Sequence, residues 1–221
     1  MQLIKKTVVI YILSVYFGTP GCGKTTILTS IAQKELRRLR KGKSCYQHVL
    51  TNFYCEGCER IDFDDLGVFL IENSLILIDE ITLYADSRGF KSFSKGLKDF
   101  FTLHRHVKND IVLFCQDYSA MDKRIRELVY DLWYVTKPVI PFFRNFSISR
   151  RIFRNITINE HTSELVLGYR FSKFLERFFL NVAKFTFRPR WYKYFDTFDP
   201  GSLSDRPSLH YEKWIINNPP P

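Results

Sequence analysis

Residues Gly18–Thr25 read G-T-P-G-C-G-K-T, a complete G-x-x-x-x-G-K-[ST] loop directly after the apolar run Thr7–Phe17. This pattern predicts a buried strand, a glycine-rich turn and a helix that starts at about Lys24. Backbone N–H groups of such a turn point at a phosphate, and the positive end of the new helix adds to the attraction. We therefore expect the nucleotide to be bound by Gly18, Thr19, Pro20, Gly21, Cys22, Gly23, Lys24, Thr25 and Thr26. The alternative, a glycine-rich turn without function, is disfavoured by the strand and helix patterns around it.

Two of these residues have side chains with expected roles of their own. Lys24 is expected to reach the β- and γ-phosphates of ATP and to act in catalysis. Thr25 is expected to offer its hydroxyl to Mg²⁺.

A second motif, S-L-I-L-I-D-E at Ser74–Glu80, is typical of a buried parallel strand that ends in two acids. At the tip of such a strand Asp79 is expected to hold Mg²⁺ through the water shell of the ion. Glu80 is placed to polarise the water that attacks the γ-phosphate. The alternative is that both acids merely cap a turn. An Asp-Glu pair favours hydrolysis over transfer to a small acceptor, so the predicted enzyme is an ATP hydrolase.

The stretch Leu103–Asp117 supplies the remaining catalytic candidates. Gln116 ends an apolar strand, where its amide can bind the attacking water or the γ-phosphate; the alternative is a simple strand-end amide. Arg105 closes the preceding helix and is a candidate arginine finger for its own or a neighbouring subunit's nucleotide. Cations also suit a helix C-terminus, and this alternative stays open. Arg124 and Arg126 are weaker finger candidates.

Strand and helix patterns alternate along the first two thirds of the chain, which predicts an α/β fold. We expect a P-loop NTPase with a mainly parallel sheet sandwiched by helices, and a small basic C-terminal hairpin and helix extension. Ligands of such sheets bind at the carboxyl ends of the strands. The expected strands are Thr7–Phe17, Tyr46–Tyr54, Ser74–Glu80, Asp110–Gln116 and Leu132–Thr136. The expected helices are Thr25–Arg40, Asp65–Glu72, Phe93–Val107 and Ser119–Val129.

Composition indicates the kind of partner. The 221 residues carry a formal charge of +10, which predicts an anionic partner, either nucleic acid or an acidic lipid surface. The five cysteines suggest a reducing compartment. Cys45, His48, Cys55 and Cys58 have zinc-like spacing, but the strand expected between them favours ordinary thiols. No stretch has the roughly 18 apolar residues of a spanning helix, so no transmembrane helix is expected.

The C-terminal third is basic and aromatic. Residues 1–140 are expected to form the ATPase core, 141–200 an extension that packs on it, and 201–221 a loosely held tail. Between Arg144 and Lys193 there are eleven Lys and Arg residues against three Asp and Glu residues. A hairpin is expected from Arg150–Ile158 and Leu165–Tyr169. Phenylalanines over 171–186 follow helical spacing, which fits a helix in a membrane interface or one packed on the core. Arg188–Lys193 interleaves cations and aromatics, as in an interfacial belt or a surface that stacks single-stranded DNA.

The chain resembles the zonular occludens toxin (Zot) family, the assembly ATPases of filamentous phages. The resemblance lies in the G-T-P-G-C-G-K-T loop, Thr51-Asn52, L-I-L-I-D-E and R-H-x₃-D-I-V-L-F-C-Q-D, continues through Asp122, Arg124 and Ile125, and spans about Val9–Asp199. It implies a peripheral ATPase at the cytoplasmic face of the host inner membrane that drives phage extrusion. Its implied partners are coat and assembly proteins, a membrane surface or membrane protein, and single-stranded DNA. Many members continue into a transmembrane helix and an external domain, which this sequence lacks, so a toxin activity is not expected.

Other functions remain open at this point. Motors of this class usually work as rings, so a homo-oligomer, possibly a hexamer, is expected. The main alternative is a DNA-packaging or conjugative DNA translocase that grips nucleic acid through its basic surface. A small-molecule P-loop kinase and a non-hydrolysing switch are less favoured, since Lys24, Asp79 and Glu80 are all present.

Overall fold

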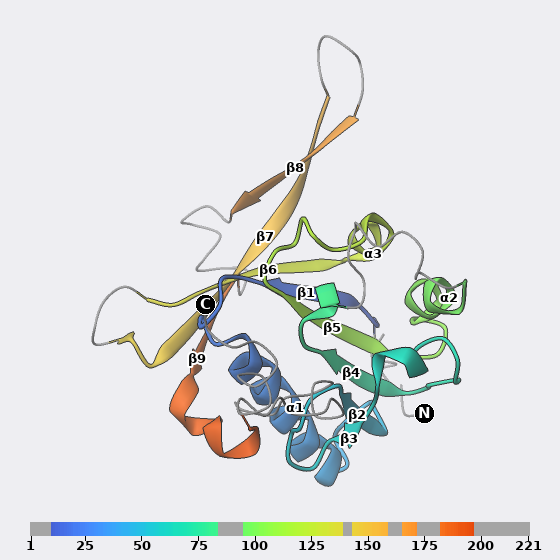
Figure 1. Cartoon of the computed structure of the whole chain (residues 1–221), viewed down its shortest axis with the longest axis vertical. Coiled ribbons are helices and arrows are strands. Elements are labelled where there is room, and N and C mark those ends of the chain that lie inside the picture. Colours follow the sequence, from blue (N-terminus) through green and yellow to red (C-terminus); the bar gives the residue numbers. More distant parts are fainter. Residues whose placement is uncertain (1–9, 84–94, 139–142, 159–164, 172–181, 197–221) are drawn as a thin grey trace, which may run out of the picture.

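A nine-stranded sheet organises the fold, in the order β3-β2-β4-β5-β1-β6-β7-β8 with β9 paired to β7 (Figure 1). The structure, a computed structural model, describes residues 10–83, 95–138, 143–158, 165–171 and 182–196. The strands are β1 (Leu13–Phe17), β2 (His48–Thr51), β3 (Glu59–Arg60), β4 (Ser74–Ile78), β5 (Asp110–Cys115), β6 (Asp131–Thr136), β7 (Phe146–Ile158), β8 (Leu165–Phe171) and β9 (Ala183–Phe187).

The first six strands are all parallel, and β1 lies between β5 and β6 near the centre. Parallel strands need both faces covered, and β4 accordingly has all five residues buried. Because the strands are parallel, their carboxyl ends meet at one edge of the sheet. The tips of β1, β5 and β4 therefore lie beside one another, with β5 in the middle. The expected α/β fold is confirmed.

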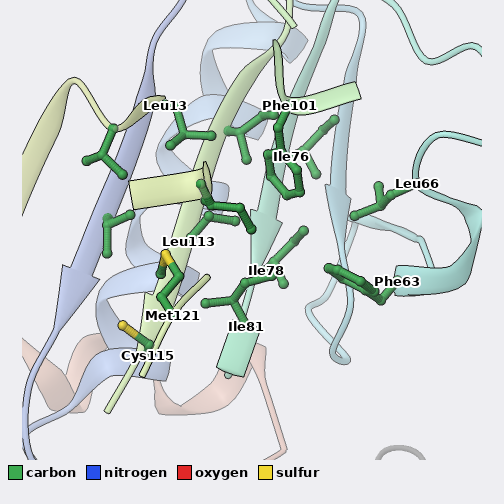
Figure 2. Packing of buried hydrophobic residues seen from close by; sticks show 14 of the residues in the cluster. Leu13, Phe63, Leu66, Ile76, Ile78, Ile81, Phe101, Leu113, Cys115 and Met121 are labelled. Carbon is green, nitrogen blue, oxygen red and sulfur yellow. The ribbon is translucent and has the colours of Figure 1, made fainter. Parts of the chain in front are cut away.

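Helices cover both faces of this parallel part (Figure 1). The helix α1 (Lys24–Arg40) lies on one face, where Ile27 and Leu28 pack with Tyr16 of β1. On the other face lie α2 (Lys95–Leu103) and α3 (Lys123–Leu128). Phe101 of α2 is fully buried in the same cluster as Ile76 and Leu113 (Figure 2). Side chains of β1 alternate between the two clusters, which fixes the strand between the helical layers.

Several expected elements are shorter in the structure: the strand expected over Thr7–Phe17 is β1, and the helix expected over Phe93–Val107 is α2. The strand expected over Tyr46–Tyr54 is the shorter β2. The helix expected over Ser119–Val129 shrinks to α3, because the Asp122 side chain caps it by accepting a hydrogen bond from the Arg124 N–H at 2.8 Å.

No helix forms over Asp65–Glu72; a 3₁₀ turn, η1 (Phe63–Asp65), precedes irregular chain there. Gly67 has φ +80°, and a Cβ on it would lie 2.3 Å from the Gly96 backbone of α2. The chain over Asp65–Glu72 is therefore irregular and not helical, because Gly67 adopts a positive φ and its backbone packs directly against that of Gly96.

The sheet of the core continues into the basic C-terminal region. Strand β7 pairs antiparallel with β6, and β7 and β8 form the expected hairpin, which projects from the rest of the molecule (Figure 1). The helix expected over 171–186 is wrong at both ends, because Phe171 belongs to β8 and Ala183–Phe187 forms β9 on β7. Residues 172–181 between them lie outside the described part of the chain. The 3₁₀ turns η4 (Arg188–Arg190) and η5 (Tyr192–Tyr194) follow β9.

Within the residues that the structure describes, none of the helices has both the length and the apolarity to cross a bilayer.

Candidate nucleotide-binding site

The phosphate loop connects the end of β1 to the start of α1 and is held from behind by β7. Gly23 has φ +92°, a left-handed conformation that favours glycine. A Cβ at Gly23 would lie 2.3 Å from the Ser147 Oγ of β7. The same Ser147 hydroxyl is fully buried and donates a hydrogen bond of 2.6 Å to the Cys22 carbonyl. The loop therefore fits its backbone against the antiparallel strand, and the first N–H groups of α1 remain open toward a ligand.

Lys24 lies inside the curve of the loop. Its Nζ donates to the Gly18 carbonyl at 2.8 Å and to the Thr19 carbonyl at 3.4 Å. The same Nζ is 3.9 Å from Glu80 Oε1, and the lysine is only 7% exposed. The two carbonyls and the carboxylate hold the ammonium at the mouth of the loop, where a polyphosphate would meet it.

Thr25 and Asp79, the two expected metal residues, are in direct contact. The Thr25 hydroxyl donates to Asp79 Oδ2 at 2.8 Å. Burial raises the pKa of the Asp79 carboxyl, an effect that the hydrogen bond from Thr25 opposes. A hydroxyl and a carboxylate are hard oxygen donors of the kind that Mg²⁺ prefers, and an enclosed carboxylate is favoured by a cation beside it. The residues at this point therefore fit Mg²⁺.

Asn52, at the end of β2, fixes the backbone of Asp79. Its Oδ1 accepts from the Asp79 N–H at 2.8 Å, and its Nδ2 donates to the Asp79 carbonyl at 3.0 Å. The sequence motifs predict no separate role for Asn52. An asparagine that directly follows an apolar strand is a signal for such a position, but the partner depends on β2 pairing with β4.

Glu80 and Gln116 meet across the tips of β4 and β5. The Gln116 Nε2 donates to Glu80 Oε1 at 3.3 Å. Glu80 has φ +49°, a conformation that costs a residue with a side chain about 1 kcal/mol or more, and such strain is often stored at functional sites. Because β5 lies between β1 and β4, Gln116 stands between the phosphate loop and the two acids. Lys24, Thr25, Asp79, Glu80 and Gln116 are thus brought together.

Arg105 is not part of this cluster. It follows α2 and precedes the amino end of β5, where the Asn73 N–H donates to the Val107 carbonyl at 2.9 Å. The cluster lies at the carboxyl ends of the same parallel strands, so Arg105 is at the opposite edge of the sheet. The expectation that Arg105 acts on the nucleotide of its own subunit is therefore wrong. A role at the nucleotide of a neighbouring subunit remains a proposal.

Arg124 and Arg126, the weaker finger candidates, have partners nearby. The Arg124 guanidinium pairs with Asp122 at 2.9 Å, and the Arg126 guanidinium lies 5.9 Å from the centre of the Tyr118 ring.

The cluster opens into a cavity of about 310 Å³. It is lined by Pro20, Gly21, Gly23, Lys24, Thr25, Thr26, Glu80, Gln116, Arg188, Tyr192 and Phe195. The last three come from η4, η5 and the residue after them. The sequence pattern instead predicts an interfacial belt or a DNA-stacking surface for Arg188 and Tyr192, because nothing local shows that η4 returns to the phosphate loop. The cavity has the size of a small-molecule site.

The cysteines expected to be ordinary thiols do not gather around a metal in the described residues. No group of three or more His, Cys, Asp and Glu residues there is placed to hold an ion. Cys55 and Cys58 lie on one tight turn, in which the Cys58 N–H donates to the Cys55 carbonyl at 3.0 Å.

Comparison with known proteins gives a family match. The family model described as zonular occludens toxin (Zot) matches residues 56–164, which include Asp79, Glu80 and Gln116. No curated protein matches the chain.

Similar solved structures include the N-terminal domain of zonular occludens toxin from Neisseria meningitidis, with a TM-score of 0.48, 16% identity, and coverage of 76% of this chain and 98% of that one. The genome packaging NTPase B204 of Sulfolobus turreted icosahedral virus 2, in complex with ATP-gammaS, has a TM-score of 0.44, 10% identity, and coverage of 73% and 98%. EccC of Thermomonospora curvata has a TM-score of 0.39, 11% identity, and coverage of 74% and 37%.

Proposed function

We propose, because residues 56–164 of this chain match the zonular occludens toxin (Zot) family model, that it is an ATP-hydrolysing P-loop motor that drives assembly and extrusion of filamentous phage. Its place would be the inner face of the host membrane, with phage coat and assembly proteins as partners. The observation that carries the enzymatic part is the convergence of the phosphate loop, the Thr25–Asp79 contact and the Glu80–Gln116 pair on one cavity. The motor role rests on the family.

The residues around the cavity fit the binding of a triphosphate. The open N–H groups at the start of α1 and the Lys24 ammonium would bind its β- and γ-phosphates, which carry most of the charge. Held by Thr25 and Asp79, Mg²⁺ would neutralise charge on the phosphate oxygens. Lys24 would leave the loop carbonyls for the phosphates, a movement of one flexible side chain.

Hydrolysis would fall to the two residues at the tips of β4 and β5. Glu80 would accept the proton of the attacking water, and Gln116 would orient that water through its amide. Asp79 holds Glu80 in place, because Asp79 Oδ1 accepts a hydrogen bond of 3.0 Å from the Glu80 N–H. The two adjacent acids would therefore have different roles, Asp79 at the metal and Glu80 at the attacking water.

A DNA translocase is the second candidate, and one group of contacts favours it. The Arg150 guanidinium lies 5.2 Å from the centre of the Phe171 ring, and that of Arg170 lies 5.4 Å from the centre of the Phe153 ring. Cations that alternate with aromatic rings on the β7–β8 hairpin suit a single-stranded nucleic acid. The same surface also suits an acidic membrane, which the phage motor would require.

Two measurements test the proposal. Wild type should release inorganic phosphate from ATP with Mg²⁺, and Glu80→Gln should bind ATP as well as wild type but turn it over 10²- to 10⁴-fold more slowly. Equal turnover by the two proteins, or phosphate found in a small acceptor, would refute the hydrolase.

The partner is then decided by adding anionic vesicles or single-stranded DNA to the wild type. Stimulation by the vesicles supports the extrusion motor. Stimulation by DNA, with binding that weakens steeply as salt rises, supports the translocase.

A further inference from the structure

We propose that Arg188 and Tyr192 belong to the nucleotide site, Arg188 as a ligand of the phosphates and Tyr192 as the wall against which the base stacks. This inference rests on the proposed binding of ATP and adds to it the C-terminal part of the chain. Four observations support it: the place of Arg188 on the phosphate loop, its unpaired guanidinium nitrogen, the charge of the cavity, and the aromatic pair that continues the cavity.

Arg188 lies directly on the phosphate loop. A Cβ on Gly23 would be 3.2 Å from the Arg188 Cδ and 3.5 Å from its Nε. The backbone of Arg188 is fixed there, because its N–H donates to the Asn145 carbonyl at 2.9 Å, just before β7. Its side chain therefore starts from a rigid point beside the loop residues that bind phosphates.

The guanidinium of Arg188 has unused hydrogen-bonding capacity. Its Nε donates to the Tyr192 hydroxyl at 3.0 Å. Its Nη1 is buried and, among the described residues, has no hydrogen-bond partner. A buried charged donor without a partner is costly, and a phosphate oxygen in the cavity would satisfy it.

The charge of the cavity agrees with an anionic ligand that carries Mg²⁺. Its ionisable lining consists of Lys24, Arg188 and Glu80, with the tyrosine as a neutral neighbour, and the Asp79 carboxylate lies just behind Thr25. The two cations offset the two carboxylates, and a Mg²⁺ ion held by Thr25 and Asp79 would leave an excess of positive charge toward the ligand. Arginine binds phosphate through a planar fork, which a lysine at the same place would not supply.

Tyr192 supplies an apolar face on the same side. It lines the cavity, is 44% exposed, and its ring centre lies 6.3 Å from that of Phe195 in an edge-to-face arrangement. A half-exposed ring beside a phosphate site is suited to stack on a base. Trp191, between the two cavity residues, instead turns into the protein and is only 4% exposed. These residues thus face the nucleotide rather than forming one continuous aromatic belt.

The test compares two arginines of η4. Arg190 is exposed and does not line the cavity, so Arg190→Gln is the matched control for Arg188→Gln. We expect Arg188→Gln to weaken binding of Mg-ADP and of tripolyphosphate about tenfold or more in calorimetry, as for a lost charge-assisted hydrogen bond. Arg190→Gln should stay within about twofold of wild type. Tyr192→Ala should weaken Mg-ADP about tenfold more than it weakens tripolyphosphate, since tripolyphosphate has no base and feels only the loss of the hydroxyl that holds Arg188.

The outcomes separate this inference from the proposed function. Wild type that binds no nucleotide refutes both. Wild type that binds, with Arg188→Gln of equal affinity, refutes only the inference for Arg188, and equal loss of both ligands in Tyr192→Ala refutes base stacking. If Arg188→Gln does not fold, hydrogen exchange of wild type decides: amides of 186–195 should exchange more slowly with Mg-ADP, and unchanged exchange overturns the inference.

Discussion

The side chain of Asn52, which follows β2, makes two hydrogen bonds to the backbone of Asp79, which follows the neighbouring strand β4. The asparagine accepts from the Asp79 N–H at 2.8 Å and donates to its carbonyl at 3.0 Å. The two bonds set where the carboxylate stands, and the carboxylate in turn accepts from Thr25 at 2.8 Å. The residue that follows β2 thereby determines the geometry of the expected metal position without touching the metal itself.

Asn52→Ala is expected to lower ATP turnover at least tenfold, because Asp79 and Glu80 lose their anchor. Asn109→Ala is the matched control. Asn109 also bridges backbone groups, accepting from the Ser74 N–H at 2.9 Å and donating to the Ile71 carbonyl at 2.8 Å, but at the other edge of the sheet. Both variants should lose about 1–3 kcal/mol of unfolding free energy in urea. If the turnover of folded protein falls equally in both, Asn52 has only a structural role.

Thr25→Ala should raise the Mg²⁺ concentration needed for half-maximal hydrolysis about 10- to 100-fold, since an oxygen donor and the bond to Asp79 are both lost. Thr25→Ser keeps the hydroxyl and should stay near wild type. The measurement is a Mg²⁺ titration of ATPase rate at saturating ATP. A Thr25→Ser variant as impaired as Thr25→Ala would mean that the methyl group, and not the oxygen, matters.

Gly23→Ala should destabilise the protein by about 2–4 kcal/mol, because it adds the cost of a positive φ to a collision with Ser147. Gly42→Ala shares the positive φ, at +63°, but meets nothing within 4 Å and should cost only about 1 kcal/mol. Urea unfolding of the three proteins checks the difference. Similar losses in the two variants would show that the loop has room to retreat from β7.

The pH dependence of stability should report on Asp110. Burial raises the pKa of this carboxyl, although it accepts hydrogen bonds from the Tyr46 hydroxyl and from the Ile12 N–H at 2.6 Å. A raised pKa in the folded state means that stability from this group is present at low pH and is lost as pH rises through that pKa. The free energy of unfolding of Asp110→Asn, relative to that of wild type, should therefore be higher at pH 7 than at pH 4.5. Urea unfolding of both proteins at both pH values measures this difference in stability. The same difference at pH 7 and at pH 4.5 would contradict a raised pKa of Asp110.

Arg105 is expected to act only between subunits, so its loss should be complemented. Arg105→Ala alone should reduce turnover about 10³-fold if it is an arginine finger. Mixed with Glu80→Gln subunits, which have an intact arginine, it should regain activity, because intact sites then meet intact fingers. Lys98→Ala, which removes an exposed cation of α2, is the control, and its turnover should equal that of wild type without added Glu80→Gln subunits. An Arg105→Ala protein with full activity would exclude the finger.

Local sequence was sufficient for the parts of the site that lie on one strand and the turn after it. The phosphate loop, Asp79 and Glu80 follow from short motifs, because strand, turn and helix are adjacent in the chain. Asn52 could not be assigned in this way, since its role depends on how β2 and β4 pair. Ser147 is 125 residues from Cys22 in sequence, and only the folded sheet brings them together. The role expected for Arg105 at its own nucleotide was wrong for the same reason. Arg105 is close to Gln116 in the sequence motif, but the full length of β5 separates the two residues in space.

The hydroxyl of Ser147 connects the β7–β8 hairpin directly to the phosphate loop. Strand β7 runs without interruption from Phe146, beside the loop, to Ile158 in the projecting hairpin (Figure 1). One continuous strand thus joins the hydroxyl that holds the Cys22 carbonyl to the projecting hairpin.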